Sequence, residues 1–218
     1  MGLRRPALLS LRFDSLGGYG NVRSAVAGRR ILGRRNRYLG LLDRINHWHD
    51  DAPSAGIQGP LLAAGDYPEE DWEAVIGINL TGVWSCMKHE LRAMVARGGG
   101  AIVNVSSNFG LVGQESMPAY CASKHGVIGL SKSAALDYAK HGVRVNALCP
   151  GATRTPLIDK IVAADPARGE ELIGQIEAAL PLGRMAEAGE IAQAAVWLCS
   201  DQARMVTGAI LSVDGGYV

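Results

Sequence analysis

Residues 101–124 read AIVNVSSNFGLVGQESMPAYCASK and decide how the surrounding chain is expected to fold. The opening AIVNVSS is a short, β-branched and nearly continuous apolar run, typical of a parallel strand buried on both faces. Pro118 suits the first turn of a helix, where the N–H that proline lacks would have no partner. Apolar residues then follow along one face as far as Lys140. The stretch predicts a strand over 101–106 and a helix over 118–140.

The same alternation continues on both sides of this stretch. Before it, apolar residues recur at helical spacing over 68–97, and the glycines at 98–100 end this helix. Asp66 followed by Glu69 resembles a capping box at the start of the helix. After it, buried strands are predicted from RVNALCPG (144–151) and AILSV (209–213), and a helix from EAGEIAQAAVWLCS (187–200).

Strands that alternate with helices of about ten residues or more favour right-handed crossovers and a parallel sheet covered on both faces. We therefore expect an α/β fold, a Rossmann-like doubly wound parallel sheet in a single domain. Ligands of such sheets bind at the carboxyl ends of the strands. The residues directly after two of the strands are therefore candidates for a site: Ser106 and Ser107, and then residues 149–155.

Composition excludes several classes of protein. Apolar residues make up 48% of the 218 and charged residues 20%, close to an average globular domain. No apolar run reaches the roughly 20 residues that cross a bilayer, and Arg12 and Asp14 interrupt the first leucines before a secretory signal forms. Four cysteines without a CxxC pair indicate reduced, mostly buried thiols. We expect a cytoplasmic protein that does not bind a membrane.

Residues 1–52 differ from the rest of the chain. They contain ten arginines, no lysine, seven glycines and four acidic residues, so their net charge is +6 against −5 for the remainder. A basic arm that binds nucleic acid is one interpretation. A solvated surface segment is the other, and we expect no nucleic-acid partner. We divide the chain into this atypical segment and a catalytic portion over residues 53–218.

A cluster near the end of the Arg-rich segment has the residue types that bind metals. It consists of His47, His49, Asp50 and Asp51. Nothing else at helical or turn spacing completes a ligand set. No metal site is therefore expected.

Tyr120 and Lys124 form the first candidate chemical pair. A spacing of four residues places both side chains on one face of a helix. A phenol in water titrates at about pH 10, and an ammonium beside a phenol favours the phenolate. Proton exchange with a substrate oxygen then becomes feasible at neutral pH. Ser107 ends a buried strand thirteen residues before Tyr120, so its hydroxyl can face the same crevice.

The run SSNFGLVGQESMPAYCASK resembles the catalytic segment of the short-chain dehydrogenase/reductase family, a strand-end serine followed by Tyr-x-x-x-Lys. Three further stretches are similar to the family's active-site asparagine stretch, its PG motif and its C-terminal strand with a VDGG turn: INLTG (78–82), NALCPGATRTP (146–156) and TGAILSVDGGYV (207–218). Order and spacing agree over residues 55–218. The resemblance implies the doubly wound fold and an NAD- or NADP-dependent oxidoreductase that interconverts an alcohol and a carbonyl.

The resemblance also implies a role for each matching residue. Tyr120 is the general acid in reduction and the general base in oxidation, while Lys124 favours its phenolate and holds the nicotinamide ribose. Ser107 binds the substrate oxygen, and Asn79 anchors a water that links Lys124 to solvent. Asn79, Tyr120 and Lys124 also belong to the expected cofactor site, whose other members are Ala55, Gly56, Pro150, Gly151, Thr153 and Thr155. Thr155 and the backbone at Thr153 are expected on the carboxamide.

Two departures from the family pattern affect the cofactor site. Residues 1–52 contain no TGxxxGxG turn, whose glycines let the backbone approach a pyrophosphate, and the glycines of SLGGYGNV have a different spacing. The family's NNAG stretch is represented only by Pro53–Gly56. We therefore expect the first βαβ units to be incomplete or irregular, and NAD and NADP remain alternatives.

A second hypothesis follows from these departures: a catalytically impaired scaffold or interaction protein without a complete dinucleotide site. Under either hypothesis, the resemblance implies a homo-oligomer, a dimer or tetramer, because family members commonly pack the long helix and the Tyr-bearing helix against their counterparts. The substrate is expected to be a small alcohol or ketone. Sugars, steroids, acyl thioesters and small cyclic alcohols all fit the residues expected to shape the pocket, which are Asn108, Phe109, Gln114, Glu115 and residues 157–182. Cys121 and Cys149 are expected to pack rather than react.

Overall fold

The computed structural model describes residues 8–11, 56–155, 162 and 165–218 of the chain. Its centre is a parallel four-stranded sheet in the order β1-β2-β3-β6. The strands are β1 (Leu8–Leu11), β2 (Gly100–Val105), β3 (Val143–Pro150) and β6 (Ile210–Val213). The strands predicted over 101–106, 144–151 and 209–213 are confirmed.

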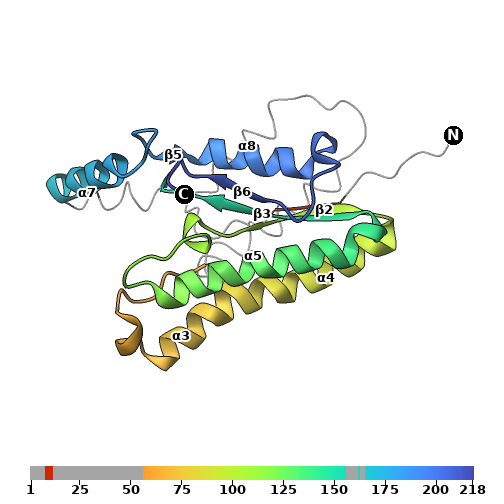
Figure 1. Cartoon of the computed structure of the whole chain (residues 1–218), viewed down its shortest axis with the longest axis horizontal. Helices are drawn as coiled ribbons and strands as arrows, with labels where there is room; N and C mark the ends of the chain where they lie inside the picture. Colours follow the sequence, from red (N-terminus) through yellow and green to blue (C-terminus); the bar gives the residue numbers. More distant parts are fainter. Residues whose placement is uncertain (1–7, 12–55, 156–161, 163–164) are drawn as a thin grey trace.

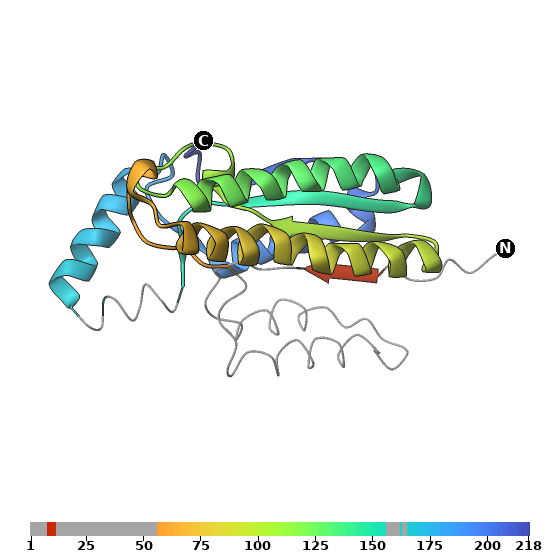
Figure 2. The ribbon, with the colours of Figure 1, turned by 90° about the horizontal axis from the view of Figure 1, so that it is seen from below.

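Helices cover both faces of this sheet (Figure 1). α4 (Gly82–Arg97) and α5 (Pro118–Tyr138) lie side by side on one face, as Figure 2 also shows, and α8 (Ala188–Cys199) lies on the other. Successive side chains of a strand point to opposite faces. Ile102 of β2 therefore packs with α4 and α5, whereas Val103 packs with α8. The predicted single-domain α/β fold is confirmed.

The long helix before β2 has three consecutive parts. α3 (Glu69–Ile76) continues into η3 (Gly77–Thr81), a π-helical turn, and then into α4. The extent predicted over 68–97 is confirmed, but the π turn was not predicted. The capping box expected at Asp66 is wrong, because Asp66 belongs to η2 (Ala64–Asp66) and Pro68 precedes α3 without a side-chain cap.

The end of α4 and the start of β2 lie where the three glycines predict them. Gly98 follows the last turn of α4 with a φ of 85°, and its N–H donates to the carbonyls of Met94 and Val95. This left-handed conformation costs a glycine little because it has no Cβ. The helix therefore stops within one residue, and β2 begins at Gly100.

α7 (Pro166–Ala178) is a helix that the sequence did not predict. Its start nevertheless carries a signal, since the Asp165 carboxylate accepts a hydrogen bond from the backbone N–H of Arg168 at 3.2 Å. Proline at the first helical position adds to that signal. The remaining short elements are η4 (Asn108–Gly110), η5 (Ala139–His141), β4 (Thr153–Arg154), β5 (Ala186–Glu187) and η6 (Asp201–Ala203).

β1 lies inside the Arg-rich segment, which was expected to lack a regular strand pattern. It pairs in parallel with β2, with Leu8 opposite Gly100 and Leu11 opposite Val103. That expectation is therefore wrong for residues 8–11, whose short leucine run is long enough for an edge strand. Ala55, the His47 to Asp51 cluster and the glycines of SLGGYGNV lie outside the described residues.

None of the helices in the described part of the chain is both long and apolar enough to cross a membrane. Nor do residues 8–11, 56–155, 162 and 165–218 bring together three or more His, Cys, Asp or Glu side chains as a metal site. All four cysteines are free; Cys149 and Cys199 are buried, Cys121 is half-buried and Cys86 is exposed. The expectation of buried thiols therefore holds for two of the four.

Candidate active site

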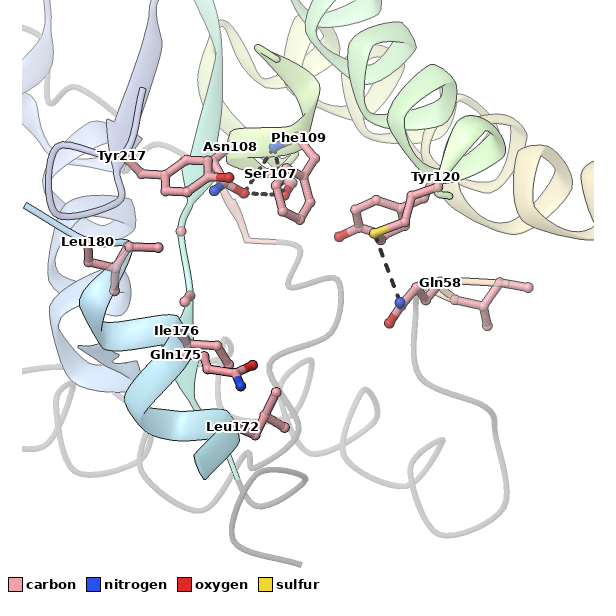
Figure 3. Close-up of a pocket in the computed structure, with 15 residues that line it drawn as sticks. Gln58, Ser107, Asn108, Phe109, Tyr120, Leu172, Gln175, Ile176, Leu180 and Tyr217 are labelled. Atoms are coloured by element: carbon pink, nitrogen blue, oxygen red, sulfur yellow. Dashed lines mark hydrogen bonds between the residues drawn. The ribbon is translucent and has the colours of Figure 1, made fainter. Parts of the chain in front are cut away.

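A cavity of about 510 Å³ opens at the carboxyl ends of β2 and β3 (Figure 3). The segment after β2 supplies Ser107, Asn108 and Phe109 to its wall, and the turn after β3 supplies Gly151 and Ala152. The other lining residues are Ile57, Gln58, Met117, Tyr120, Leu172, Gln175, Ile176, Ala179, Leu180 and Tyr217. None of these side chains is charged. The cavity lies where open α/β sheets bind their ligands.

Tyr120 and Lys124 lie one turn apart in the first half of α5. The Tyr120 side chain points into the cavity, on the side where Ser107 lies (Figure 3). Lys124 is completely buried behind it, with its Nζ 5.4 Å from the centroid of the Tyr120 ring. The predicted pairing of the two side chains on one helix face is confirmed by this geometry.

Asn79 connects the π turn to the turn of α5 that carries Tyr120. Its Oδ1 accepts a hydrogen bond from the backbone N–H of Ile57 at 2.9 Å, and its Nδ2 donates to the carbonyl of Ile57 at 2.8 Å. The same Nδ2 donates to the Ser123 hydroxyl at 3.2 Å, which in turn donates to the carbonyl of Tyr120 at 2.7 Å. Asn79 is fully buried. A chain of hydrogen bonds therefore joins Ile57 to the backbone of Tyr120.

A second serine fixes the same helix to the sheet. The hydroxyl of Ser106, directly after β2, donates to the backbone carbonyl of Lys124 at 2.8 Å. Because both serines are buried, water does not compete for these bonds. Ser106 and Ser123 together hold the backbone of Lys124 and Tyr120 in place. The sequence did not indicate this use of Ser123, although its position between the tyrosine and the lysine is a signal for it.

Ser107 adopts an extended backbone and its hydroxyl lies at the cavity wall. Its Oγ accepts a hydrogen bond from the backbone N–H of Phe109 at 3.2 Å and donates to Oδ1 of Asn108 at 3.0 Å. Oδ1 also accepts from the same Phe109 N–H at 2.9 Å. The Ser107 hydroxyl therefore donates its proton to Asn108, and a ligand oxygen in the cavity would have to replace Asn108 as the acceptor.

The turn after β3 approaches the end of β6 closely. A Cβ at Gly151 would lie 2.6 Å from Cα of Asp214, so no other residue fits there without a shift of backbone. Asp214 itself is buried and accepts hydrogen bonds from the backbone N–H groups of Gly216 and Val218 at 3.0 and 3.2 Å. The Thr153 hydroxyl donates to the carbonyl of Gly151 at 3.0 Å. These contacts form a narrow backbone floor at the carboxyl end of the sheet.

The opposite wall of the cavity comes from α7 and the C-terminus. Leu172, Gln175 and Ile176 project from α7, and Tyr217 packs edge-on against Phe109 with ring centroids 6.2 Å apart (Figure 3). The pocket expected from Asn108, Phe109 and the segment up to 182 is confirmed for its described part. Gln114 and Glu115 are exposed and do not line the cavity, so that expectation is wrong.

The structure brings only some of the predicted site residues to the cavity. Ser107, Tyr120 and Gly151 line it, whereas Asn79 and Lys124 lie directly behind the Tyr120 turn. Gly56, Pro150, Thr153 and Thr155 are not among the lining residues. The sequence missed Ile57, Gln58, Met117 and Tyr217, because they lie within or next to the motifs but have no chemistry that marks them as site residues.

Cys149 lies at the end of β3 close to the site. Burial raises the pKa of its thiol to about 11, against smaller opposing effects from the hydrogen bond with Ser106 and the Lys124 charge. The thiol is therefore protonated at neutral pH and is a poor nucleophile. This supports the expectation that Cys149 packs rather than reacts.

The fold and site together define an α/β protein with a ligand cavity at the carboxyl ends of a parallel sheet. A family model described as enoyl-(acyl carrier protein) reductase matches residues 47–218. The cis-4-hydroxycyclohexanecarboxylate dehydrogenase of Sinomonas cyclohexanicum is 48% identical over 164 residues, which are 75% of this chain and 63% of that protein. The cyclohexanol dehydrogenase of an Acinetobacter strain is 41% identical over 164 residues, 75% of this chain and 61% of that protein.

A comparison with solved structures also finds a dehydrogenase. A putative 2-deoxy-d-gluconate 3-dehydrogenase from Agrobacterium tumefaciens with bound NADP superposes with a TM-score of 0.66 at 36% identity, over 74% of this chain and 64% of that one. The chain belongs to the short-chain dehydrogenase/reductase family. It spans less than two thirds of the length of the two dehydrogenases.

Proposed function

We propose that this chain is an NAD- or NADP-dependent oxidoreductase that interconverts a small alcohol and its carbonyl. One observation carries the proposal: the hydroxyl-bearing side chains of Ser107 and Tyr120 line one cavity, and a buried Lys124 lies 5.4 Å behind the tyrosine ring. The family membership supports the same reaction class.

In the proposed reaction Tyr120 exchanges a proton with the reacting oxygen, as a base during oxidation and an acid during reduction. Lys124 favours the phenolate by its positive charge. Ser107 hydrogen-bonds the same oxygen and stabilises negative charge that develops on it. The Ser107 hydroxyl must first turn away from Asn108 Oδ1, to which it donates a hydrogen bond in the free protein. The nicotinamide supplies the hydride in reduction and accepts it in oxidation.

The nicotinamide end of a dinucleotide fits the described residues. A nicotinamide ring would lie over the turn after β3, where Gly151 lines the cavity and packs closely against Asp214. Tyr120 and Lys124 would hold the ribose hydroxyls, Asn79 would support that turn, and Thr153 and Thr155 would hold the carboxamide. Pro150 and Gly56 complete the proposed set, with Ala55.

The substrate we propose is a compact, uncharged cyclic alcohol or ketone. None of the described residues that line the cavity is charged, and Phe109, Met117, Leu172, Ile176 and Leu180 give it apolar walls. An acyl thioester carries phosphates that would find no cation among these lining residues. Two relatives are dehydrogenases of cyclohexane derivatives, which supports a cyclic substrate; cyclohexanol is uncharged, whereas cis-4-hydroxycyclohexanecarboxylate carries a carboxylate.

We further propose a homo-oligomer, a dimer or tetramer, in the cytoplasm. Trp72 and Trp84, on α3 and α4, are 41% and 47% exposed, which is unusual for tryptophan and typical of an interface. The free cysteines are compatible with a reducing compartment. Sedimentation as a monomer at micromolar concentration would contradict the oligomer.

Nicotinamide absorbance with cyclohexanol or cyclohexanone tests the reaction. Tyr120→Phe is expected to lower turnover by about a hundredfold or more, because it removes the proton that is exchanged. Tyr138→Phe is the matched control, since Tyr138 lies at the end of the same helix and packs into the core away from the cavity. Turnover that survives Tyr120→Phe would exclude this mechanism. If neither NAD nor NADP raises the melting temperature of the protein, the impaired scaffold is favoured instead.

A further inference from the structure

The orientation of the Asn108 carboxamide is fixed by its neighbours. The backbone N–H of Phe109 can only donate, and it lies 2.9 Å from one of the two amide atoms. That atom must be the oxygen, because an NH2 group cannot accept. The Ser107 hydroxyl donates to the same oxygen at 3.0 Å. The other amide atom, Nδ2, therefore points away from Ser107 and Phe109.

The Asn108 carboxamide lies at the cavity wall. Asn108 is one of the lining residues and is only 6% exposed, and its Nδ2 lies on the Tyr217 side of the carboxamide, away from Ser107 (Figure 3). Among the described residues Nδ2 has no hydrogen-bond partner, whereas Oδ1 of the same amide has two. Nδ2 is also not among the polar atoms that are wholly sealed from solvent, so a ligand can reach it. The arrangement leaves a donor available to a ligand.

The other polar side chains among the described lining residues each have a hydrogen-bond partner, access to water or a role at the reacting oxygen. Ser107 and Tyr120 serve the reacting oxygen in the proposed function. Nε2 of Gln175, on the opposite wall, donates to Glu171 at 3.2 Å, and Nε2 of Gln58 contacts the sulfur of Met117 at 4.0 Å. Tyr217 is 37% exposed, so water can serve its hydroxyl. Among the described lining residues, Asn108 is therefore a mostly buried amide whose nitrogen has no partner and is available for a second polar atom of the substrate.

We propose that Asn108 determines specificity, with its Nδ2 donating a hydrogen bond to a second oxygen of the substrate. The inference rests on the proposed function and narrows its substrate class. The preferred substrates are cyclic alcohols or ketones that carry an oxygen acceptor in addition to the reacting oxygen. Oδ1, held by Phe109 and Ser107, fixes the direction in which Nδ2 points.

The test compares cyclohexanone with oxan-3-one and oxan-4-one, in which a ring oxygen replaces one methylene. Ring size stays the same, and the added oxygen can only accept. Dissociation constants come from ligand-observed NMR with the cofactor-free protein, and kcat/KM comes from nicotinamide absorbance. Each result is read as the oxanone-to-cyclohexanone ratio, because general effects of a substitution on both ketones cancel in it. The variants are Asn108→Leu, Asn108→Asp and Gln175→Leu.

Wild type is expected to prefer at least one oxanone by roughly fivefold, the effect of one net hydrogen bond. Asn108→Leu removes this preference. Asn108→Asp keeps an oxygen for Phe109 and Ser107, so local structure is retained, but reverses the preference because its second oxygen repels an acceptor. Gln175→Leu, which removes the carboxamide on the opposite wall, leaves the ratio unchanged.

Three results would overturn the assignment: no oxanone preference in wild type, a preference that persists in both Asn108 variants, or a preference lost in Gln175→Leu. Failure of the proposed function has a different signature. In that case neither dinucleotide supports turnover of any ketone, while the NMR ratios still decide the role of Asn108.

Discussion

At the residue scale, burial separates side chains that can react from those that only pack. Cys149 and Cys199 are both buried, and burial raises the pKa of their thiols to about 11 and about 12. For Cys199 the positive charge of Arg144 opposes this shift without overcoming it. A raised pKa keeps each thiol protonated at pH values below it, so the nucleophilic thiolate is scarce at neutral pH.

Alkylation with iodoacetamide at about pH 8 is therefore expected to proceed in a fixed order. Cys86, which is exposed, reacts first and Cys121, which is half-buried, follows. Cys149 and Cys199 react only after unfolding in urea. Peptide mass spectrometry over a time course measures the order, with the denatured protein as the control. Labelling of Cys149 in the native protein as fast as Cys86 would contradict it.

At the scale of elements, the π turn places Asn79 where it can hold the Tyr120-bearing turn. Asn79 bonds both the N–H and the carbonyl of Ile57 as well as Ser123. If the same residues formed a regular α-helix, the side chains that follow would be rotated about the helix axis by roughly the 100° that separates neighbouring residues. The structural contribution of Asn79 is therefore to join three separate segments behind the site.

Asn79→Leu is expected to lower the free energy of unfolding by about 2 kcal/mol, because the half-buried backbone N–H and carbonyl of Ile57 and the Ser123 hydroxyl lose their partner. Ser123→Ala removes one contact of the same chain and is expected to cost about 1 kcal/mol. Urea denaturation measures both values. An Asn79→Leu variant as stable as wild type would mean that Ile57 finds other partners.

The start of α8 carries a pH-dependent contact on the surface. Arg184 donates two hydrogen bonds of 2.8 Å to the Glu190 carboxylate, which also accepts one from the N–H of Glu187 at 2.8 Å. The hydrogen bonds with Arg184 lower the pKa of Glu190 from 4.5 to about 2. Because the folded value lies below the ordinary one, this stabilisation is complete above pH 4.5 and disappears as the pH falls toward 2.

Glu190→Gln is therefore expected to have a lower urea midpoint than wild type at neutral pH. The difference should shrink as the pH falls through that window, and also at high salt, which screens exposed charges. Comparing the two proteins at each pH cancels the titration of other carboxyl groups. A difference that stays constant down to pH 2 would assign the effect to packing instead.

The elements were predictable where periodicity is strong, and the site where chemistry is distinctive. AIVNVSS predicted β2 because both faces of that strand are buried, and the Tyr120 and Lys124 spacing predicted their pairing. The π turn was not predicted, because the apolar residues Ile76, Leu80 and Val83 continue through it at the spacings of three and four that are typical of a regular α-helix. α7 was missed because few of its side chains are buried, and β1 because four residues are too short for a period.

At the scale of the whole molecule, Arg144 joins the sheet to the helix that covers its second face. From β3 its guanidinium donates to the carbonyls of Leu198 at 2.7 Å, Ser200 at 3.1 Å and Val206 at 3.2 Å. These carbonyls lie at the C-terminal end of α8 and in the segment that leads to β6. Burial lowers the pKa of Arg144 from 12.5, but an arginine remains charged at neutral pH. The Arg144 guanidinium thus provides hydrogen bonds for backbone carbonyls at and after the C-terminal end of α8.

Arg144→Met is expected to lower the free energy of unfolding by about 2 kcal/mol, because three carbonyls lose a charged donor. Arg204→Met is the control, since Arg204 is exposed and its loss should change stability by less than about 0.5 kcal/mol. Thermal and urea unfolding measure both variants. Equal stability of the two variants would show that water replaces Arg144.

The cavity has two walls of separate origin. One wall, Ser107, Asn108 and Tyr120, is anchored to β2 and α5 by hydrogen bonds of Ser106, Ser123 and Asn79. The other consists of side chains of α7, of Leu180 shortly after it and of Tyr217; α7 lies beside the sheet rather than on it (Figure 1). Directed evolution limited to Leu172, Ile176 and Leu180 can therefore change the substrates that are accepted while the proton-transfer residues keep their positions.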